Sequence, residues 1–437
     1  MKTYRNSQLE ETTYEVTLDN GLTVFIHPKP DYQRTYAIFN TRFGSVDLNF
    51  VPLGHKKWVT APQGVAHFLE HKLFEKEFGD VFELFSEQGA SANAFTSYEQ
   101  TAYLFSTVDR VAENLELLLD FVQTPYFTEE TVEKEKGIIA QEILMYDDIP
   151  SWRIQRLMLE NLYPKHPLRY DIAGTVASIQ AITPEILYEN YRTFYHPENM
   201  QLFITGPVDP KQTLAQIEKN QAQKSFSPPA AIKRKIVAGD TADICKFRQE
   251  KADLTRPKAM LGVRGEVPTH LDPKERMIND IALRFGLAML LGMTSTNYLK
   301  LYDKGLIDDT FNYSYTSGRS FNFVTVECDT PHPKRFLNHM EKILAHATRY
   351  NDLNEDHLQL IKRKNIGSTI RSLDSLEYVA HNFLTNKHGD YTLFDQVKWM
   401  EDISLAKVKK VLTDYMSKDR MSRVVLQTSA VKDQPKA

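Results

Sequence analysis

The sequence Gly64-Val-Ala-His67-Phe-Leu-Glu70-His71 places two histidines four residues apart. In a helix, side chains at this spacing lie on one face, so both imidazoles can reach a single metal ion. Glu70 stands beside His71, and its carboxylate faces the same space. Zinc hydrolases need this set of groups, because neutral imidazoles bind the ion and a carboxylate takes the proton of a bound water. The order His-x-x-Glu-His is itself a recognised zinc-binding pattern.

Two glutamates further along the chain are candidates for a third ligand. Glu142 lies in a segment with a helical pattern, and Glu135 stands seven residues earlier, two turns back on the same face. One carboxylate can bind the metal while the other supports the site from behind the ligands. The alternative is a solvated helix face, because 25% of the residues are charged. The histidine pattern alone also arises by chance, so the third ligand carries much of the argument.

These features together resemble a known family. The motif His67-x-x-Glu70-His71, followed about seventy residues later by Glu135-x6-Glu142, resembles the inverzincin (HxxEH) zinc metallopeptidases. That family includes pitrilysin, insulin-degrading enzyme and mitochondrial processing peptidase, and the resemblance is to its two-domain bacterial type. Residues 93–101 resemble the family's substrate-binding edge strand, and residues 195–206 resemble the end of its first domain. The resemblance covers nearly the whole chain.

The resemblance implies a role for each candidate residue. His67, His71 and Glu142 are expected to bind Zn²⁺ and to leave the fourth position to a water molecule. Glu70 is the expected catalytic base, which deprotonates that water and passes the proton to the leaving amine. Glu135, the second catalytic residue, is expected to orient the ligands. The expected function is a zinc-dependent endopeptidase that cleaves unfolded peptides or small protein precursors.

Two other classes of function stay open. A non-catalytic peptide-binding scaffold or maturation factor would keep the fold with a vestigial metal site. The presence of His67, Glu70, His71 and Glu142 argues against this alternative. A hydrolase acting on a non-peptide amide is the other alternative, although no sequence feature favours it.

Composition sets the frame for these hypotheses. A chain of 437 residues with 42% hydrophobic content can bury substantial cores and suggests two or three domains. The net charge of −4 gives no reason to expect nucleic acid or an anionic membrane surface. The first residues lack the apolar region of a secretory signal, and we expect no membrane-spanning segment. With Cys245 and Cys328 interpreted as buried, reduced thiols, we expect a cytoplasmic protein.

The pattern along the chain indicates an α+β fold. Alternating apolar residues and a turn at Asp19-Asn-Gly21 predict a hairpin, and residues 91–108 are also strand-like. The metal-binding stretch and two later segments have helical spacing, with Thr128 as the expected N-cap of the helix that carries Glu135 and Glu142. We therefore expect mainly antiparallel sheets packed with helices. The expected strands cover residues 14–18, 22–26 and 35–43, and the expected helices include 79–89 and 112–122.

The chain is expected to contain two homologous domains. Residues 225–240 contain Pro228-Pro229 and a basic run and are interpreted as a linker between a catalytic domain, 1–224, and an inactive domain, 241–437. Residues 64–71 align with residues 286–293 at an offset of 222, although apolar helices can match by coincidence. In the second copy, Met289 and Met293 stand in place of the metal-binding histidines, and Gly292 stands in place of the base Glu70. Only the first half can therefore be catalytic.

The substrate is expected to bind along a strand. An extended peptide can add beside Ala92, Asn93, Ala94 and Phe95, which gives affinity through main-chain hydrogen bonds with little demand on sequence. The alternative is that these residues form an ordinary interior strand.

One departure from the family suggests a protein partner. Active members commonly carry an Arg-x6-Tyr pair in a non-catalytic domain. In this chain Tyr302 stands where the arginine is expected, and an aspartate, Asp308 or Asp309, stands near the position of the tyrosine. The resemblance then implies a heterodimer in which a homologous non-catalytic subunit supplies the pair. A homodimer is the alternative.

Overall fold

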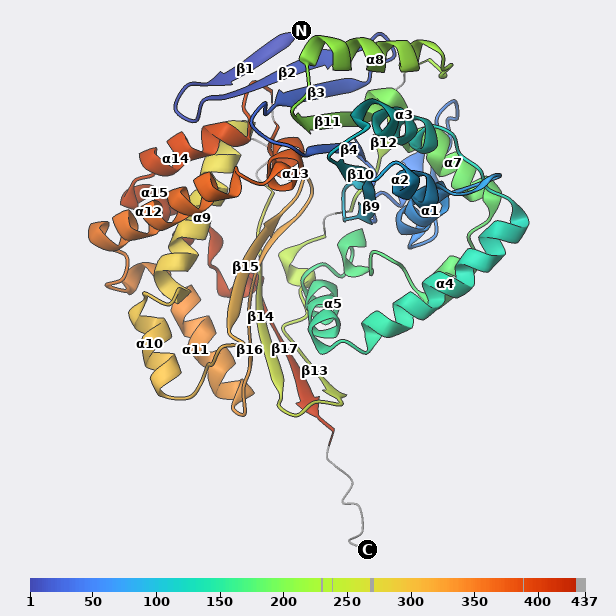
Figure 1. Cartoon of the computed structure of the whole chain (residues 1–437). Helices are drawn as coiled ribbons and strands as arrows, with labels where there is room; N and C mark the ends of the chain where they lie inside the picture. The colour runs from blue at the N-terminus through green and yellow to red at the C-terminus, as the bar shows by residue number, and fades with distance from the viewer. Residues whose placement is uncertain (229–230, 238, 268–270, 388, 430–437) are drawn as a thin grey trace, which may run out of the picture. The chain divides into compact units, whose positions relative to one another are not determined.

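The computed structural model describes all residues except 229–230, 238, 268–270, 388 and 430–437 (Figure 1). The chain forms two compact units. Unit 1 contains Met1–Ile143, Tyr170–Ile236 and Ser368–Val397, and unit 2 contains Leu144–Arg169, Val237–Gly367 and Lys398–Ala437. Each unit has a mainly antiparallel sheet packed with helices, so the predicted fold class is confirmed.

The sheet of unit 1 has seven strands, and all neighbouring pairs are antiparallel except β3 with β11. The strand β9 lies at one edge and pairs only with β10. Residues 91–108, expected as one stretch, are thus two strands joined by a turn. In sheet order the strands are β1 (Lys2–Asn6), β2 (Glu11–Thr17), β3 (Thr23–Pro28), β11 (Met200–Gly206), β4 (Thr35–Thr41), β10 (Thr101–Thr107) and β9 (Ser91–Thr96).

Helix α1 (Val65–Phe74) carries the histidine motif and lies against β9 and β10. It begins after Gly64, whose φ of 88° favours glycine, and a β-carbon there would lie 2.3 Å from the carbonyl oxygen of Ala173. Its apolar side chains enter the core, which leaves the motif on the opposite side. The other helices of unit 1 are α2 (Val81–Glu87), α3 (Val111–Val122), α6 (Val176–Gln180), α7 (Pro184–Phe194), α8 (Pro210–Ala222) and α13 (Leu376–Asn386).

The sheet of unit 2 repeats the strand order and directions of five strands of unit 1. Only β13 and β17 are parallel, as β3 and β11 are. Three strands begin 221 residues after their counterparts, which agrees with the predicted repeat. In sheet order the strands are β13 (Phe247–Ala252), β17 (Met421–Thr428), β14 (Lys258–Arg264), β16 (Asn322–Asp329) and β15 (Asn312–Ser317).

The two units exchange equivalent helices. Helix α5 (Pro150–Leu162), from the first half of the sequence, packs on β14 and β17 in unit 2. Helix α13, from the second half, packs on β4 and β11 in unit 1. The units therefore differ from the contiguous domains 1–224 and 241–437, because each apolar helix face is buried on the other half's sheet. The chain passes between the units at five points, three of which lie in the helices α4 (Glu129–Asp147), α12 (Glu355–Ser372) and α14 (Gln396–Asp402). Unit 2 also holds α9 (Pro273–Leu291), α10 (Thr296–Asp303), α11 (Pro333–Ala345) and α15 (Leu405–Tyr415).

The predicted linker, 225–240, has local structure in its described part. Lys233–Arg234 forms a short strand, β12, that pairs with β5 (Asn49–Val51), which in turn pairs with β6 (Val59–Thr60). Arg234 Nε lies 3.1 Å from the carboxylate of Asp47, which anchors this strand. Residues 229–230 and 238 of the linker lie outside the described residues. A separate small hairpin joins β7 (Glu75–Lys76) to β8 (Gly79–Asp80).

One segment is apolar enough to cross a membrane by length and composition. This segment is Pro273–Asp303, so the expectation that no such segment exists does not hold by this test. It comprises α9 and α10, and 56% of its most apolar window is buried inside the protein. Because α9 packs against α15 and β15, its apolar residues already have a place in a core, and buried core helices pass the same test.

The interpretation of both cysteines as buried is wrong for Cys245. Cys245 is exposed beside the start of β13, whereas Cys328 is buried in β16. Both are free thiols, as expected from their number.

Candidate metal centre

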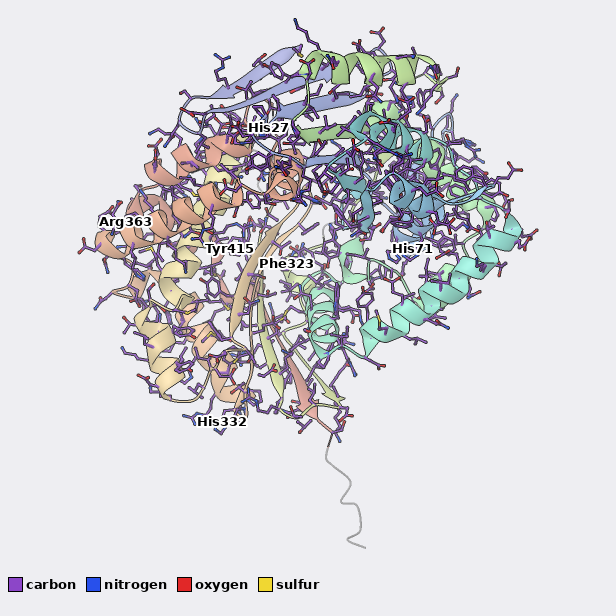
Figure 2. All side chains as sticks on the ribbon, in the orientation of Figure 1. His27, His71, Phe323, His332, Arg363 and Tyr415 are labelled. Atoms are coloured by element: carbon purple, nitrogen blue, oxygen red, sulfur yellow. The ribbon has the colours of Figure 1, made fainter. Side chains whose placement is uncertain are left out.

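The helices α1 and α4 bring His67, His71 and Glu142 together. Thr128 Oγ1 accepts a hydrogen bond from Thr131 N and so caps the start of α4. One carboxylate oxygen of Glu142 lies 3.6 Å from His67 Nε2, and the other lies 3.5 Å from His71 Nε2. One ligand atom from each of the three residues lies within 4.8 Å of the others. Figure 2 labels His71 next to the blue helices of unit 1.

This arrangement fits a zinc ion. Tetrahedral bonds of 2.0–2.2 Å place neighbouring ligand atoms about 3.4 Å apart, close to the spacings of both histidines from Glu142. Burial, helped by the charge of His71, lowers the pKa of His67 to about 3, which keeps its imidazole neutral as a ligand must be. Its Nδ1 has no hydrogen-bond partner among the described residues.

Glu135 lies behind His71. Its carboxylate oxygen is 3.0 Å from His71 Nδ1, which leaves Nε2 facing Glu142. A carboxylate in this position fixes the imidazole's orientation and tautomer. Burial lowers the pKa of His71, but the hydrogen bond to Glu135 and the charges of Glu70, Glu135 and Glu142 outweigh burial, so the net shift is upward. The same negative charge favours a divalent cation.

Glu70 is held by a residue of the edge strand. Thr96 Oγ1, at the end of β9, donates a hydrogen bond of 2.6 Å to Glu70 Oε2. Burial raises the pKa of Glu70, and the hydrogen bond from Thr96 partly offsets that rise. A carboxylate with a raised pKa beside a candidate metal-bound water is suited to accept a proton.

Thr96 and Asp171 are two further residues of the site that the sequence alone does not predict. Thr96 belongs to the quoted stretch 93–101, but its partner depends on how β9 packs on α1. The charge of Asp171 helps to raise the pKa of Glu142, although burial is the larger cause. No local pattern connects Asp171 with residues thirty positions earlier.

The predicted substrate-binding residues lie on the free edge of the sheet. Ala92, Asn93, Ala94 and Phe95 all belong to β9, so the alternative of an interior strand is excluded. The amide N–H of Ala94 donates to the Asn93 side chain at 2.8 Å and not to β10. By the alternation of antiparallel pairing, the main-chain groups of Ala92 and Ala94 face the open side. This edge can accept another strand.

A cavity of about 770 Å³ opens beside the candidate metal centre. Glu70, His71 and Glu135 form part of its wall, and Asn93 and Ala94 connect it to β9. The rest of its lining mixes aromatic and charged side chains; the aromatic ones are Phe74, Phe78, Phe82 and Tyr126. The cavity therefore joins the candidate base, the histidine ligand and the free strand edge.

Tyr302, Asp308 and Asp309 belong to unit 2. Tyr302 is on α10 with 46% of its surface exposed. Asp308 forms an ion pair with Arg256. The expected Arg-x6-Tyr pair is absent at these positions, because residue 302 is a tyrosine and residue 309 is an aspartate.

Two family models match the chain. The model described as "Insulinase (Peptidase family M16)" matches residues 42–176, which contain His67, Glu70, His71, Glu135 and Glu142. The model described as "Peptidase M16 inactive domain" matches residues 181–365, which contain none of them. The inactive-domain match thus falls outside the candidate metal centre.

Individual relatives are similar over both units. The "Uncharacterized zinc protease YmfH" of Bacillus subtilis is 45% identical over 422 residues, which cover 97% of this chain and 98% of that protein. The solved "putative M16-like peptidase" of Alicyclobacillus acidocaldarius is 35% identical with a TM-score of 0.90, covering 96% of this chain and 99% of that one. A protease structure from Helicobacter pylori is 19% identical and shares the fold, with a TM-score of 0.81 and coverage of 95% and 99%.

Proposed function

Because the chain belongs to the insulinase family, peptidase family M16, we propose that it is a zinc-dependent endopeptidase that cleaves unfolded peptides or small protein precursors. One observation carries this proposal. His67, His71 and Glu142 present two nitrogens and a carboxylate at zinc-ligand spacing, and Glu70 lies next to them on α1. This is the donor set of a hydrolytic zinc site with one open position.

Each residue then has a defined task. When bound, zinc would lower the pKa of a coordinated water and polarise the scissile carbonyl. Glu70 accepts the proton of the attacking water and delivers it to the leaving amine. Thr96 holds one oxygen of Glu70 by its hydrogen bond and leaves the other for this proton transfer. Glu135 holds the ring of His71 in its ligand orientation.

The free edge of β9 supports a peptide substrate. An extended chain can pair with the main-chain groups of Ala92 and Ala94, because no strand among the described residues pairs with β9 on that side. The Ala94 N–H, now bonded to the side chain of Asn93, becomes a donor to the peptide. The adjoining cavity, with its aromatic and charged lining, accepts a side chain of the same peptide. Such binding requires an unfolded segment but no fixed sequence.

We further propose that the active form is a cytoplasmic heterodimer. The absence of the Arg-x6-Tyr pair at Tyr302 and Asp309 supports a homologous non-catalytic subunit that supplies it. In this arrangement the present chain is the metal-bearing subunit. A homodimer that cleaves peptides at full rate would contradict this part of the proposal.

Cleavage of a quenched, unstructured peptide of about twenty residues tests the function. Zinc-loaded protein is assayed alone and with an extract of its source cells, beside the Glu70→Gln variant. Cleavage that needs both the extract and intact Glu70 is the expected result. Cleavage by the chain alone would support the proposed peptidase activity and contradict the proposed heterodimer. If intact and variant protein are equally inert in both conditions, the peptide-binding scaffold replaces the enzyme.

A further inference from the structure

Unit 2 contains a cavity of about 380 Å³ that is separate from the candidate metal centre. Its walls come from α9, α15 and the neighbouring ends of β15 and β16. Asn279 and Leu283 stand one turn apart on α9, and Val411 and Tyr415 stand one turn apart on α15. Tyr415 is labelled in Figure 2. The volume is in the range of small-molecule sites.

Three polar atoms of this cavity have no hydrogen-bond partner among the described residues. They are Asn279 Oδ1, Asn322 Oδ1 and the hydroxyl of Tyr415. Asn322 is only 5% exposed, and its Nδ2 donates to the carbonyl of Glu266 at 2.8 Å, which fixes the direction of Oδ1. A buried acceptor without a donor is costly, so these atoms require a partner.

Two of these atoms converge on the same point. A β-carbon built on Gly265 would lie 1.5 Å from Asn322 Oδ1 and 2.6 Å from the hydroxyl oxygen of Tyr415. Both oxygens therefore lie over the bare α-carbon of Gly265. Burial raises the pKa of Tyr415 well above its usual value, so its hydroxyl remains a neutral phenol.

The charged groups around the cavity do not favour an anion. Each of its three cations already has a carboxylate partner, the pairs being Lys407 with Glu275, Lys410 with Asp414 and Arg420 with Glu266. A fourth carboxylate, Asp280, accepts hydrogen bonds from Tyr315 at 2.6 Å and Ser317 at 2.8 Å. Acidic groups thus outnumber basic groups, and the unpartnered amide oxygens can only accept.

We propose that this cavity binds a primary ammonium ion carried on a short alkyl chain. An ammonium group has three N–H donors, which suit the oxygens of Asn279, Asn322 and Tyr415. The alkyl chain contacts Leu283 and Val411, and the ring of Tyr415 adds aromatic surface. The ring of Tyr315 already carries the guanidinium of Arg284, 5.1 Å from its centroid. Free amines, lysine side chains and peptide amino termini share this chemistry.

Ligand-observed saturation-transfer NMR on the full chain tests the proposal. The probe is n-butylammonium, and n-butanol is its uncharged control of equal length. Nα-acetyl-lysinamide carries only a side-chain ammonium and leucinamide only an α-ammonium, so their relative affinities identify the source. Tyr415→Phe removes only the hydroxyl and should weaken n-butylammonium binding about 2- to 10-fold, the effect of one hydrogen bond. Asn279→Ala is the second variant, and Tyr302→Phe, an exposed tyrosine of the same unit, is the control.

Saturable n-butylammonium binding, weaker in Tyr415→Phe or Asn279→Ala and unchanged in Tyr302→Phe, supports the site. Absence of binding, equal binding of n-butanol, or unchanged affinity in both variants overturns it, because the cavity then holds only water or apolar groups. If Tyr415→Phe fails to fold, the Asn279→Ala variant still tests the site, because Asn279 is only partly buried. The measurement needs neither zinc nor substrate, so its result is independent of the proposed peptidase activity.

Discussion

Removing Glu135 is expected to weaken zinc binding without removing a ligand. In the Glu135→Ala variant, His71 loses its Nδ1 partner, at 3.0 Å, and with it the interaction that directs Nε2 toward Glu142. The lost contact is a hydrogen bond to a charged group, worth about 1.5–3 kcal/mol. At about 1.4 kcal/mol for each tenfold change, this predicts zinc affinity reduced about 10- to 100-fold.

A graded series separates charge from shape. Glu135→Gln keeps an oxygen that can accept from Nδ1 but loses the charge, so its zinc affinity should fall between wild type and Glu135→Ala. Glu133→Gln is the matched control, because Glu133 lies on the same helix, is 61% exposed at its side chain and pairs only with Lys136 among the described contacts. Its zinc affinity should stay within twofold of wild type, about 0.4 kcal/mol.

The assay is competition for zinc with a chromophoric chelator at fixed pH and salt. It reports metal affinity directly and does not depend on a peptide substrate or a partner subunit. If Glu135→Ala binds zinc as tightly as wild type, the reasoning is refuted, since His71 would then be oriented by its own helix alone. Circular dichroism of each variant excludes loss of fold as the cause of a weaker affinity.

Three further predictions concern the base, the metal and a buried lysine. Thr96→Val removes the hydroxyl and should lower kcat about tenfold with little change in KM, whereas Thr96→Ser keeps the hydroxyl and should retain kcat; an unchanged kcat in Thr96→Val would mean that the hydrogen bond does not matter. Stripping zinc with a chelator should lower the unfolding midpoint, because a ligand at about a thousand times its Kd contributes about 4 kcal/mol, and zinc but not magnesium should restore it. Burial lowers the pKa of Lys76 to about 7 from 10.5, so between these values the unfolded chain holds a proton that the folded one lacks, and stability rises with pH. The free energy of unfolding, measured with urea, should therefore rise more between pH 7 and pH 9 in wild type than in Lys76→Met. An identical rise in both proteins would contradict this prediction.

The candidate ligands could be predicted because their geometry is mostly local. Helical spacing alone places His67 and His71 on one face, and the structure keeps that relation. Glu142 needed the family resemblance, because spacing alone left Glu135 as an equal candidate. The structure distinguishes them by contact, since Glu142 faces both histidines and Glu135 faces only the Nδ1 side of His71.

What the sequence could not show depends on packing between distant segments. The strand β1 was not predicted because Lys2–Asn6 is polar and mostly exposed, so it carries no apolar period. The amphipathic pattern of α5 predicts a buried face but not the sheet that buries it. On β14, Gly262 leaves room for Met158 of α5, whose sulfur would lie 2.3 Å from a β-carbon there. That close approach is invisible until both segments are placed.

Both units contain a hydrogen bond from a hydroxyl at the end of an edge strand to a carboxylate on a helix, but the carboxylates stand at different sequence positions. Thr96 and Ser317 stand 221 residues apart at the ends of the equivalent strands β9 and β15, and each hydroxyl donates to a carboxylate. In unit 1 the acceptor is Glu70, in the metal motif. In unit 2 it is Asp280, twelve residues before Gly292, the position that aligns with Glu70. At 1.5 Å per residue, Asp280 stands about 18 Å earlier along the chain's helical path than the aligned position, although it meets the equivalent end of the equivalent strand.

Unit 2 lacks more than the side chains of a metal site. Helix α9 ends at Leu291 and Gly292 is already extended, so the positions aligned with Glu70 and His71 are no longer helical. Met289 is fully buried while Met293 is 69% exposed, so these two residues point into different environments and cannot share one ion. The strand frame was retained, but the replacement of both histidines by methionines and the early end of helix α9 prevent a second metal site of this kind.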